Sequence, residues 1–458
     1  SETFDVNHSS KASKDPSVKS VGITGQITGT RADLLISDDV ETAANSMTAV
    51  MREQINGKIK EYESIVKPDT GEILFLGTPQ TEDSIYCQLP NMGYEVRIWP
   101  AHFGFTEDRY SGTVAPSLVE QREADPSLAE GGLDNLGAPT DTRFNETDLT
   151  ERMLATGRAY YTLQFMLDTR GNADLYPLRL RDLVVTDLNP NLGPEKVVWS
   201  NARELLVDDN VPNVGLSGDK FYGPLTAAMT DVGYLDYTRS LLCVDPSGRG
   251  KDETSWCVVK ELNGFLYVLG WGGFTEGYDR EKVLIPLVNI AKTYGVRTIL
   301  TESNMGDGMF NKLLEPIINK TYPCGLEEVA NTTRKEDRIC DTLEPVMNSH
   351  RLIFDKNVIR EDLRTAQLMY PADKAVLRSG IYQMSRMMRQ KGALAHDDRI
   401  DVLAIAVQWF VDAMNADEDQ LIANREEDEW NREIEAFMSE ATGGRFSIDG
   451  VSMLDNAL

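Results

Sequence analysis

The sequence predicts an α/β fold made of more than one domain. Apolar runs of strand length alternate with helical patterns along most of the chain, as they do in α/β domains. Several of these runs end in a carboxylate, and ligands collect at the carboxyl ends of strands in such folds. The length agrees, because 458 residues with 41% hydrophobic content suffice for two or three ordinary globular domains.

The N-terminal part of the chain follows a strand, helix, strand order. Residues 34–37 form an apolar strand with Asp38 and Asp39 at its carboxyl end, and residues 45–62 carry helical apolar spacing. Residues 72–76 form the next strand, which ends in Gly77-Thr78-Pro79-Gln80. Beyond them we expect a strand at 94–99, loops at 104–142, a helix at 147–166 and a connector at 188–235.

From residue 239 the pattern changes to three short strands joined by turns, at 241–244, 255–260 and 265–269. A helix at 280–294 and a strand at 296–301 follow, and then helices at 308–319, 335–348, 359–368 and 396–410, with a short strand at 352–354. We therefore expect an α/β domain at 1–145, a lid or linker subdomain at 146–235, a second α/β domain at 236–415 and an acidic tail at 416–458.

Composition narrows the classes of protein. The net charge of −27 argues against a surface coated in basic residues, but it leaves room for a local basic track. No apolar run approaches the roughly 20 residues of a membrane span, and no apolar signal segment stands at the N-terminus. The five cysteines contain no CxxC pair, which favours reduced thiols in a cytoplasmic protein over a disulfide framework or a zinc site.

Three segments carry the acids of a candidate metal site. Asp245 ends the strand at 241–244, Glu302 ends the strand at 296–301, and Asp397, Asp398 and Asp401 open the helix at 396–410. Divalent metals such as Mg²⁺ prefer oxygen ligands, and two such ions can drive phosphodiester cleavage. Each acid also has a simpler interpretation, because Asp245 suits a turn, Glu302 precedes a turn and HDDRID suits a helix N-terminus. Together, in this strand order, the three segments favour the metal site.

The segment LLISDD resembles a Walker B strand, in which Asp38 would hold Mg²⁺ on a nucleotide phosphate and Asp39 would stand in the place of a catalytic acid. A plain strand ending in an Asp-Asp turn is the alternative. The phosphate-binding pattern GxxxxGK[ST] is absent from the sequence, and Gly248-Arg249-Gly250-Lys251 imitates it without the leading Gly. We therefore expect this chain to bind ATP poorly by itself.

Two stretches carry clustered positive charge. One contains Arg378, Arg386, Arg389 and Lys391 and leads into His396, and the other contains Lys312, Lys320, Arg334, Lys335 and Arg338. Basic side chains beside a carboxylate cluster suit a DNA phosphate backbone, although solvated helix faces look the same in sequence. His396 suits a metal-side or proton-transfer group, or simply a structural position.

These motifs, in this order, resemble the large subunit of phage DNA-packaging terminases of the short-tailed phage type. The resemblance is carried by GITGQITGTRADLLISDDV, FLGTPQ, LLCVDPSGRGKDETSWCVV, ILTESNMGDGMF and HDDRIDVLAIAV and covers nearly the whole chain. It implies an ASCE-type, P-loop NTPase-like ATPase domain, here partial, followed by an RNase H-like nuclease domain. It places Asp38 and Asp39 on Walker B, Thr78 in the coupling motif and Arg31 near phosphate.

For the nuclease, the resemblance implies that two Mg²⁺ or Mn²⁺ ions are held by Asp245, Glu302 and an Asp of the HDD segment. Asp398 is the first choice within that segment, and Asp397 and Asp401 stay open. The family's Walker A loop would precede residue 1, so the ATPase activity of this chain, unlike that of a full-length protein, is in question.

The resemblance also implies ATP-driven packaging of viral double-stranded DNA into proheads and endonucleolytic cleavage of concatemers. The implied partners are double-stranded DNA, the portal protein, the small terminase subunit and further copies of the chain in a ring. The implied place is the host cytoplasm, on the prohead, without a membrane. The alternatives are a non-motor RNase H-fold nuclease or resolvase with an accessory domain, and a structural packaging component with decayed sites.

Overall fold

The computed structural model describes residues 2–6, 16–25, 29, 31–110, 112–169, 175–207, 210–225, 232–247, 252–303, 308–331 and 333–416. The predicted acidic tail from residue 417 onward and the Gly-rich turn at 248–251 lie outside these residues. Within the described ranges, no helix is long and apolar enough to cross a membrane.

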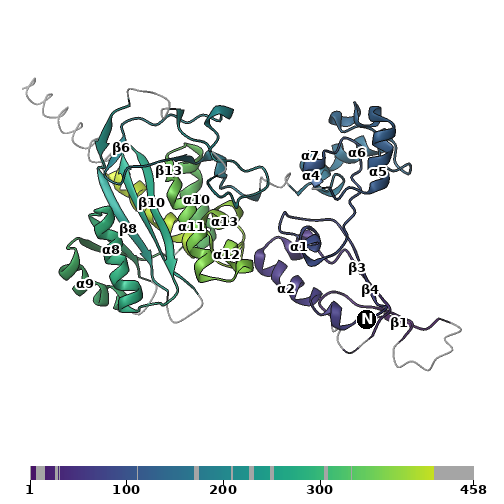
Figure 1. The fold of residues 1–458 in the computed structure, drawn as a ribbon, viewed down its shortest axis with the longest axis horizontal. Helices are drawn as coiled ribbons and strands as arrows, with labels where there is room; N and C mark the ends of the chain where they lie inside the picture. The colour runs from purple at the N-terminus through teal and green to yellow at the C-terminus, as the bar shows by residue number, and fades with distance from the viewer. Residues whose placement is uncertain are drawn as a thin grey trace, which may run out of the picture.

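A seven-stranded mixed sheet in the second half of the chain positions the candidate site (Figure 1). Its strand order is β12-β11-β8-β9-β10-β13-β5. The central strands β8 (Arg239–Asp245), β9 (Thr254–Leu262) and β10 (Phe265–Phe274) are antiparallel. Parallel pairing adds β11 (Thr298–Glu302) and β12 (Gly325–Val329) on one side, and β13 (Leu352–Asp355) and β5 (Val184–Thr186) on the other.

Both faces of this sheet are covered, which explains the near-continuous apolar runs of its strands. On β8, Leu241 and Cys243 belong to one core, and Leu242 and Val244 belong to the other. The second face is covered by α8 (Ile285–Tyr294) and α9 (Met309–Thr321). The first face is covered by α10 (Lys335–Asn348), α11 (Lys356–Met369), α13 (Gly380–Arg386) and a helix at 398–416.

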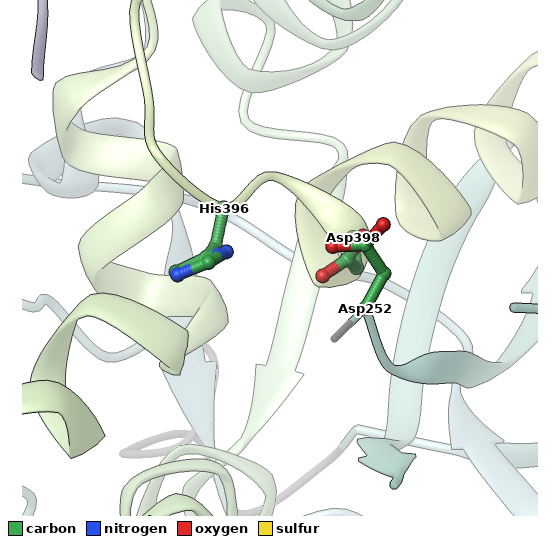
Figure 2. Close-up of side chains that lie close together, drawn as sticks. All are labelled: Asp252, His396 and Asp398. Atoms are coloured by element: carbon green, nitrogen blue, oxygen red, sulfur yellow. The ribbon is translucent and has the colours of Figure 1, made fainter. Parts of the chain in front are cut away.

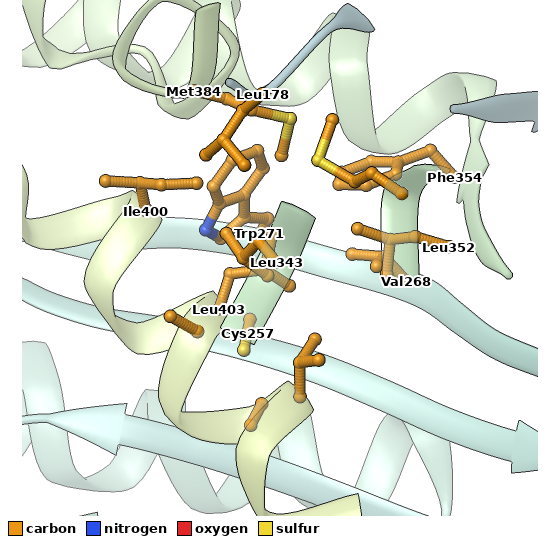
Figure 3. Packing of buried hydrophobic residues seen from close by; sticks show 14 of the residues in the cluster. Leu178, Cys257, Val268, Trp271, Leu343, Leu352, Phe354, Met384, Ile400 and Leu403 are labelled. Carbon is orange, nitrogen blue, oxygen red and sulfur yellow. The ribbon is translucent and has the colours of Figure 1, made fainter. Parts of the chain in front are cut away.

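Trp271 of β10 lies in the middle of the first core. Figure 3 shows its indole beside Ile400 and Leu403 of the helix at 398–416 and beside Met384 of α13. All four side chains are almost fully buried. The carboxylate-bearing helix is therefore packed directly on the central strands of the sheet.

The N-terminal part contains a separate parallel pair, β3 (Leu34–Asp38) and β4 (Glu72–Leu76). Between these strands run α1 (Ala43–Ser46) and α2 (Ala49–Ile59), whose Ile55 and Ile59 pack in the same small core as the partly buried Leu35 and Ile73. The remaining elements are α3 (Ile85–Gln88), α4 (Glu107–Tyr110), α5 (Pro116–Ala124), α6 (Glu146–Thr156), α7 (Arg158–Gln164) and α12 (Ala372–Arg378), with the short strand pairs β1 (Glu2–Phe4) with β2 (Val18–Ser20) and β6 (Leu192–Pro194) with β7 (Tyr234–Asp236).

Each strand and helix predicted from residue 239 onward is present, and the predicted α/β class is correct. β10 runs five residues and the last helix six residues beyond the predicted end, and α12 and α13 were not predicted. The differences have local causes. β12 was not predicted, because GLEEV is a polar edge strand. β5 was not predicted either: it lies just before the expected connector at 188–235, inside the expected lid or linker subdomain, and joins the sheet as its other edge strand. The helix expected at 147–166 is interrupted by Gly157, whose φ of 83° leaves the helical region. The strand expected at 94–99 is only a bridge from Ile98 to Val114, and the expected loops at 104–142 contain α5.

Candidate metal centre

Three carboxylates meet at the carboxyl end of the central strands. Asp245 is the last residue of β8 and Glu302 is the last residue of β11, and the parallel pairing of these neighbouring strands brings both ends to one edge. Asp401 comes from the first turn of the helix at 398–416. One ligand oxygen from each of Asp245, Glu302 and Asp401 lies within 4.8 Å of the other two. We call these three residues the carboxylate triad.

Two cations of α10 contact the triad. Lys335 Nζ lies 3.0 Å from Asp401 Oδ2 and 2.7 Å from Asp397 Oδ1. Arg338 Nη1 lies 3.3 Å from Glu302 Oε1, and its Nη2 donates to Asp401. Lys335 stands in the first turn of α10, where the helix dipole disfavours a positive charge, so its contacts with carboxylates outweigh that cost.

Burial shapes the protonation of this centre. It raises the pKa of the Asp245 carboxyl well above its usual value, and the carboxylates of Glu302 and Asp401 raise it further. Burial also raises the pKa of Asp401, although Lys335 and Arg338 oppose the rise. Burial alone would lower the pKa of the Lys335 ammonium, but Asp401 and Asp397 outweigh it and raise that pKa. The four carboxylates of Asp245, Glu302, Asp401 and Asp397 are met by two cations, Lys335 and Arg338, and this arrangement of oxygen ligands suits a divalent cation.

A second cluster lies on the same helix, one turn earlier. One ligand atom from each of Asp252, His396 and Asp398 lies within 4.8 Å of the others, and Figure 2 shows Asp252 and Asp398 close together at the start of the helix. Asp398 Oδ2 also lies 3.3 Å from Nη1 of the buried Arg378. Burial raises the pKa of Asp398 to about 7, Asp397, Asp252 and Glu253 add to the rise, and Lys335 opposes it. Burial and then Arg378 lower the pKa of His396.

The structure thus separates the three acids of HDDRID. Asp401 joins Asp245 and Glu302, whereas Asp398, the first choice from sequence, joins Asp252 and His396, and Asp397 pairs with Lys335. Residues at i and i+3 share a helix face, but they stand one turn apart along the axis. The sequence therefore predicts that these acids share one face of the helix, but it does not predict how far along the sheet the helix lies.

The four basic residues predicted to contact DNA also fall into two groups in the structure. Arg378 and Arg386 are buried, and Arg386 Nε lies 3.0 Å from Asp83 Oδ2 of the N-terminal part. Arg389 is exposed and pairs with Asp341 and Glu344, and Lys391 is exposed. The placement of Arg378 and Arg386 does not support the predicted DNA contact, because both guanidinium groups are turned to acids inside the fold. Among these four positions, the predicted role stays open for Arg389 and Lys391.

The structure brings part of the predicted nucleotide site together. Asp38 and Asp39 are exposed at the carboxyl end of β3, and Asp38 pairs in register with Leu76, two residues before Thr78. Asp39 has a φ of 44°, and its N–H donates to the Leu76 carbonyl at 3.0 Å. Arg31 lies three residues before β3, on the side of the strand opposite to the end that carries Asp38. Its guanidinium donates to the Ser64 carbonyl, and it does not join the acids.

Several residues that build these regions escaped the sequence analysis. Glu41 is buried, and its carboxylate accepts from Ser84 Oγ and the Ile85 N–H, each at 2.9 Å, which ties the end of β3 to the segment after β4. Burial raises its pKa. A third acid just after Asp38-Asp39 was the available signal. Lys335 and Arg338 were named as candidates for a DNA backbone contact or a solvated face, and their ion pairs with the triad were not predicted, although their i, i+3 spacing matches that of Asp398 and Asp401.

Comparison with known proteins gives a consistent result. The family model "Terminase Bacteriophage T7, Ribonuclease H-like domain" matches residues 244–352. The "Terminase, large subunit" of Enterobacteria phage T3 is 43% identical over 425 residues, which cover 91% of this chain and 70% of the relative.

Weaker matches among solved structures include two terminase nuclease domains. The human cytomegalovirus terminase nuclease domain, soaked with manganese and bound to an inhibitor, shares 11% identity over 38% of this chain and 82% of its own, with a TM-score of 0.28. The nuclease domain of the large terminase subunit of bacterial virus Sf6 shares 15% identity over 38% of this chain and 90% of its own, with a TM-score of 0.25.

Proposed function

Since the chain belongs to the large-subunit family of short-tailed phage terminases, we propose that its carboxylate triad holds divalent metal ions and cuts viral double-stranded DNA. The nuclease belongs to the RNase H-like type that the family model describes. The observation that carries the proposal is the meeting of Asp245, Glu302 and Asp401 within 4.8 Å at one edge of the sheet.

The donor set fits a hard divalent cation. All three ligands are carboxylate oxygens, Glu302 and Asp401 are almost fully buried, and burial is the main cause of the raised pKa values of Asp245 and Asp401, which a bound divalent cation would lower. Bound there, Mg²⁺ or Mn²⁺ ions would lower the pKa of a water molecule and stabilise the leaving oxygen of the phosphodiester. The number of ions is part of the proposal, and two is the number that the chemistry favours.

The side chains around the triad have separate roles in this proposal. Lys335 and Arg338 hold Asp401 and Glu302 in place and limit the repulsion between the carboxylates. Lys335, whose side chain is 34% exposed, would also meet the negative charge of an approaching DNA phosphate. The exposed Arg389 and Lys391 would contact the backbone farther along the duplex.

We further propose that this nuclease is one half of an ATP-driven packaging protein. Asp38 and Asp39 would face the nucleotide and its Mg²⁺, and Thr78 would lie in the segment that links hydrolysis to movement. The buried Glu41 supports this link, because it bonds the end of β3 to the segment after Gln80. Double-stranded DNA, the portal protein, the small terminase subunit and further copies of the chain are the proposed partners, on the prohead in the host cytoplasm.

The direct test is cleavage of supercoiled plasmid DNA by the purified chain with Mn²⁺ or Mg²⁺. We expect metal-dependent nicking that EDTA abolishes and that Asp245→Ala reduces about a thousandfold, because metal assistance contributes several kcal/mol of transition-state stabilisation. Asp187→Ala, which changes an exposed acid away from the triad, is the matched control. Equal cleavage by the wild type and Asp245→Ala would exclude the triad as the nuclease site.

A further inference from the structure

Arg399 stands between Asp398 and Asp401 in the sequence, yet it points away from both clusters into the fold. Its side chain is 0% exposed and lies between two buried acids. Arg399 Nε lies 2.9 Å from Glu253 Oε2, and Nη1 lies 2.7 Å from Asp362 Oδ1 and 2.8 Å from the Asp362 carbonyl. The helix at 398–416 is thereby tied to the start of β9 and to α11.

The two acids that hold Arg399 are fixed in turn. Asp362 accepts hydrogen bonds from Ser379 Oγ at 2.6 Å and from the Gly380 N–H at 2.9 Å, at the start of α13. Glu253 lies directly before the first residue of β9 and is 2% exposed. Neither acid can follow the Arg399 guanidinium if the helix slides, so the ion pairs define one position of the helix.

Side chains of the sheet also hold the backbone of the helix. Ser255 Oγ donates to the Asp398 carbonyl at 2.7 Å, and Trp271 Nε1 donates to the Arg399 carbonyl at 2.7 Å. Ser255 is the register partner of Asp245 across β8 and β9. The residue that holds the first turn of the helix therefore stands directly opposite the strand carboxylate of the triad.

These contacts fix the height of the helix against the sheet, which the apolar core alone does not define. Ile400 and Leu403 could pack on the sheet at slightly different heights, but a shift of one turn would move Asp401 by about 5.4 Å. A buried ion pair adds little stability compared with apolar residues, and its best-attested use is to fix one arrangement among several. Partners that orient metal ligands typically affect metal affinity about 10–100-fold.

We propose that Arg399, Ser255 and Trp271 are positioning residues for the proposed metal site. They set the height and rotation of the helix at 398–416 so that Asp401, and not Asp398, meets Asp245 and Glu302. The inference rests on the proposed function of the triad as a metal site. It adds three residues outside the triad whose effect is transmitted through the helix.

The test uses the full chain and Mn²⁺ as the probe, with affinity measured by titration calorimetry and stability measured by thermal melting. The main variant is Ser255→Ala combined with Trp271→Phe, which removes two donors. Because Trp271→Phe also makes a buried side chain smaller, the thermal melt reports its separate effect on the core. Tyr267→Phe is the matched control, because it removes a buried hydroxyl that donates to the Pro194 carbonyl at 3.2 Å on the opposite face of the same sheet. Arg399→Lys tests the ion pairs and, if it does not fold, the double variant still decides the question.

We expect the double variant to bind Mn²⁺ about tenfold more weakly and to need correspondingly more Mn²⁺ for plasmid nicking. Tyr267→Phe should keep the wild-type affinity. Unchanged Mn²⁺ affinity in a folded double variant, or an equal loss in Tyr267→Phe, would overturn the positioning role. If Asp245→Asn binds Mn²⁺ as tightly as the wild type, the proposed metal site is rejected, and the positioning role is rejected with it.

Discussion

The acids at one edge of the seven-stranded sheet are assembled into a centre, whereas the acids at the end of β3 are not. At the edge of the seven-stranded sheet, Asp245, Glu302 and Asp401 are brought together by two strands and a helix and are met by Lys335 and Arg338. At the end of β3, Asp38 and Asp39 stand exposed on a two-stranded sheet whose Ile36 is 56% exposed. Carboxylates at strand ends thus become a site through burial and counter-charges supplied by other elements.

Removing the buried cation next to the assembled centre should have the largest effect on stability. Arg399→Leu leaves Glu253 and Asp362 as uncompensated buried charges, and we expect it to lower the free energy of unfolding by about 3–5 kcal/mol. Arg364→Leu, which breaks a solvent-exposed pair with Glu361, should change the free energy of unfolding far less, because exposed ion pairs are screened by water. Urea unfolding followed by fluorescence measures both variants, and similar losses would contradict the contrast.

The two regions should also differ in how much their ligands stabilise the fold. Mn²⁺ at a hundred times its dissociation constant should raise the free energy of unfolding by about 2.7 kcal/mol, through binding to the folded state alone. ATP should give a much smaller shift, because the sequence contains no GxxxxGK[ST] loop. Thermal melting with each ligand checks this prediction, and a larger shift with ATP would reverse the comparison.

The pH dependence follows from the raised pKa values of Asp245 and Asp401. Both groups contribute most stability to the metal-free fold below their unfolded pKa near 3.9, and this contribution is lost as the pH rises through the raised folded values. Mn²⁺ needs the ionised carboxylates, so its affinity should increase with pH and binding should release protons. Calorimetry at about pH 6 in two buffers of different ionisation enthalpy detects that release, and proton uptake would contradict the assignment.

The smallest predicted effect concerns DNA binding. Lys391 is exposed, so Lys391→Ala should weaken DNA binding uniformly across sequences and reduce the slope of log affinity against log salt by about 0.9. Arg386→Ala is the informative comparison, because it should remove the ion pair with Asp83 and lower the stability of the fold, but leave that slope unchanged. Fluorescence anisotropy at several salt concentrations measures both slopes.

Local sequence signals predicted most of the second half of the fold and the strand acids of its candidate site. The apolar runs of β8, β9 and β11 and the periodicity of α10 were sufficient, and Asp245 and Glu302 were found because each directly ends a strand. The choice between Asp398 and Asp401 was not predictable, because it depends on the height at which Ser255, Trp271 and Arg399 hold the helix. The burial of Arg378 and Arg386 depends likewise on partners distant in sequence, such as Asp83.

The most direct test of the central claim is Mn²⁺ binding by two matched variants, Asp401→Asn and Asp398→Asn, measured by calorimetry against the wild type. Both substitutions remove one carboxylate charge from the same helix, one turn apart. We predict that Asp401→Asn loses Mn²⁺ binding at the triad and that Asp398→Asn retains it. Loss of binding in Asp398→Asn with binding retained in Asp401→Asn would contradict the triad and place the metal at the cluster of Asp252, His396 and Asp398.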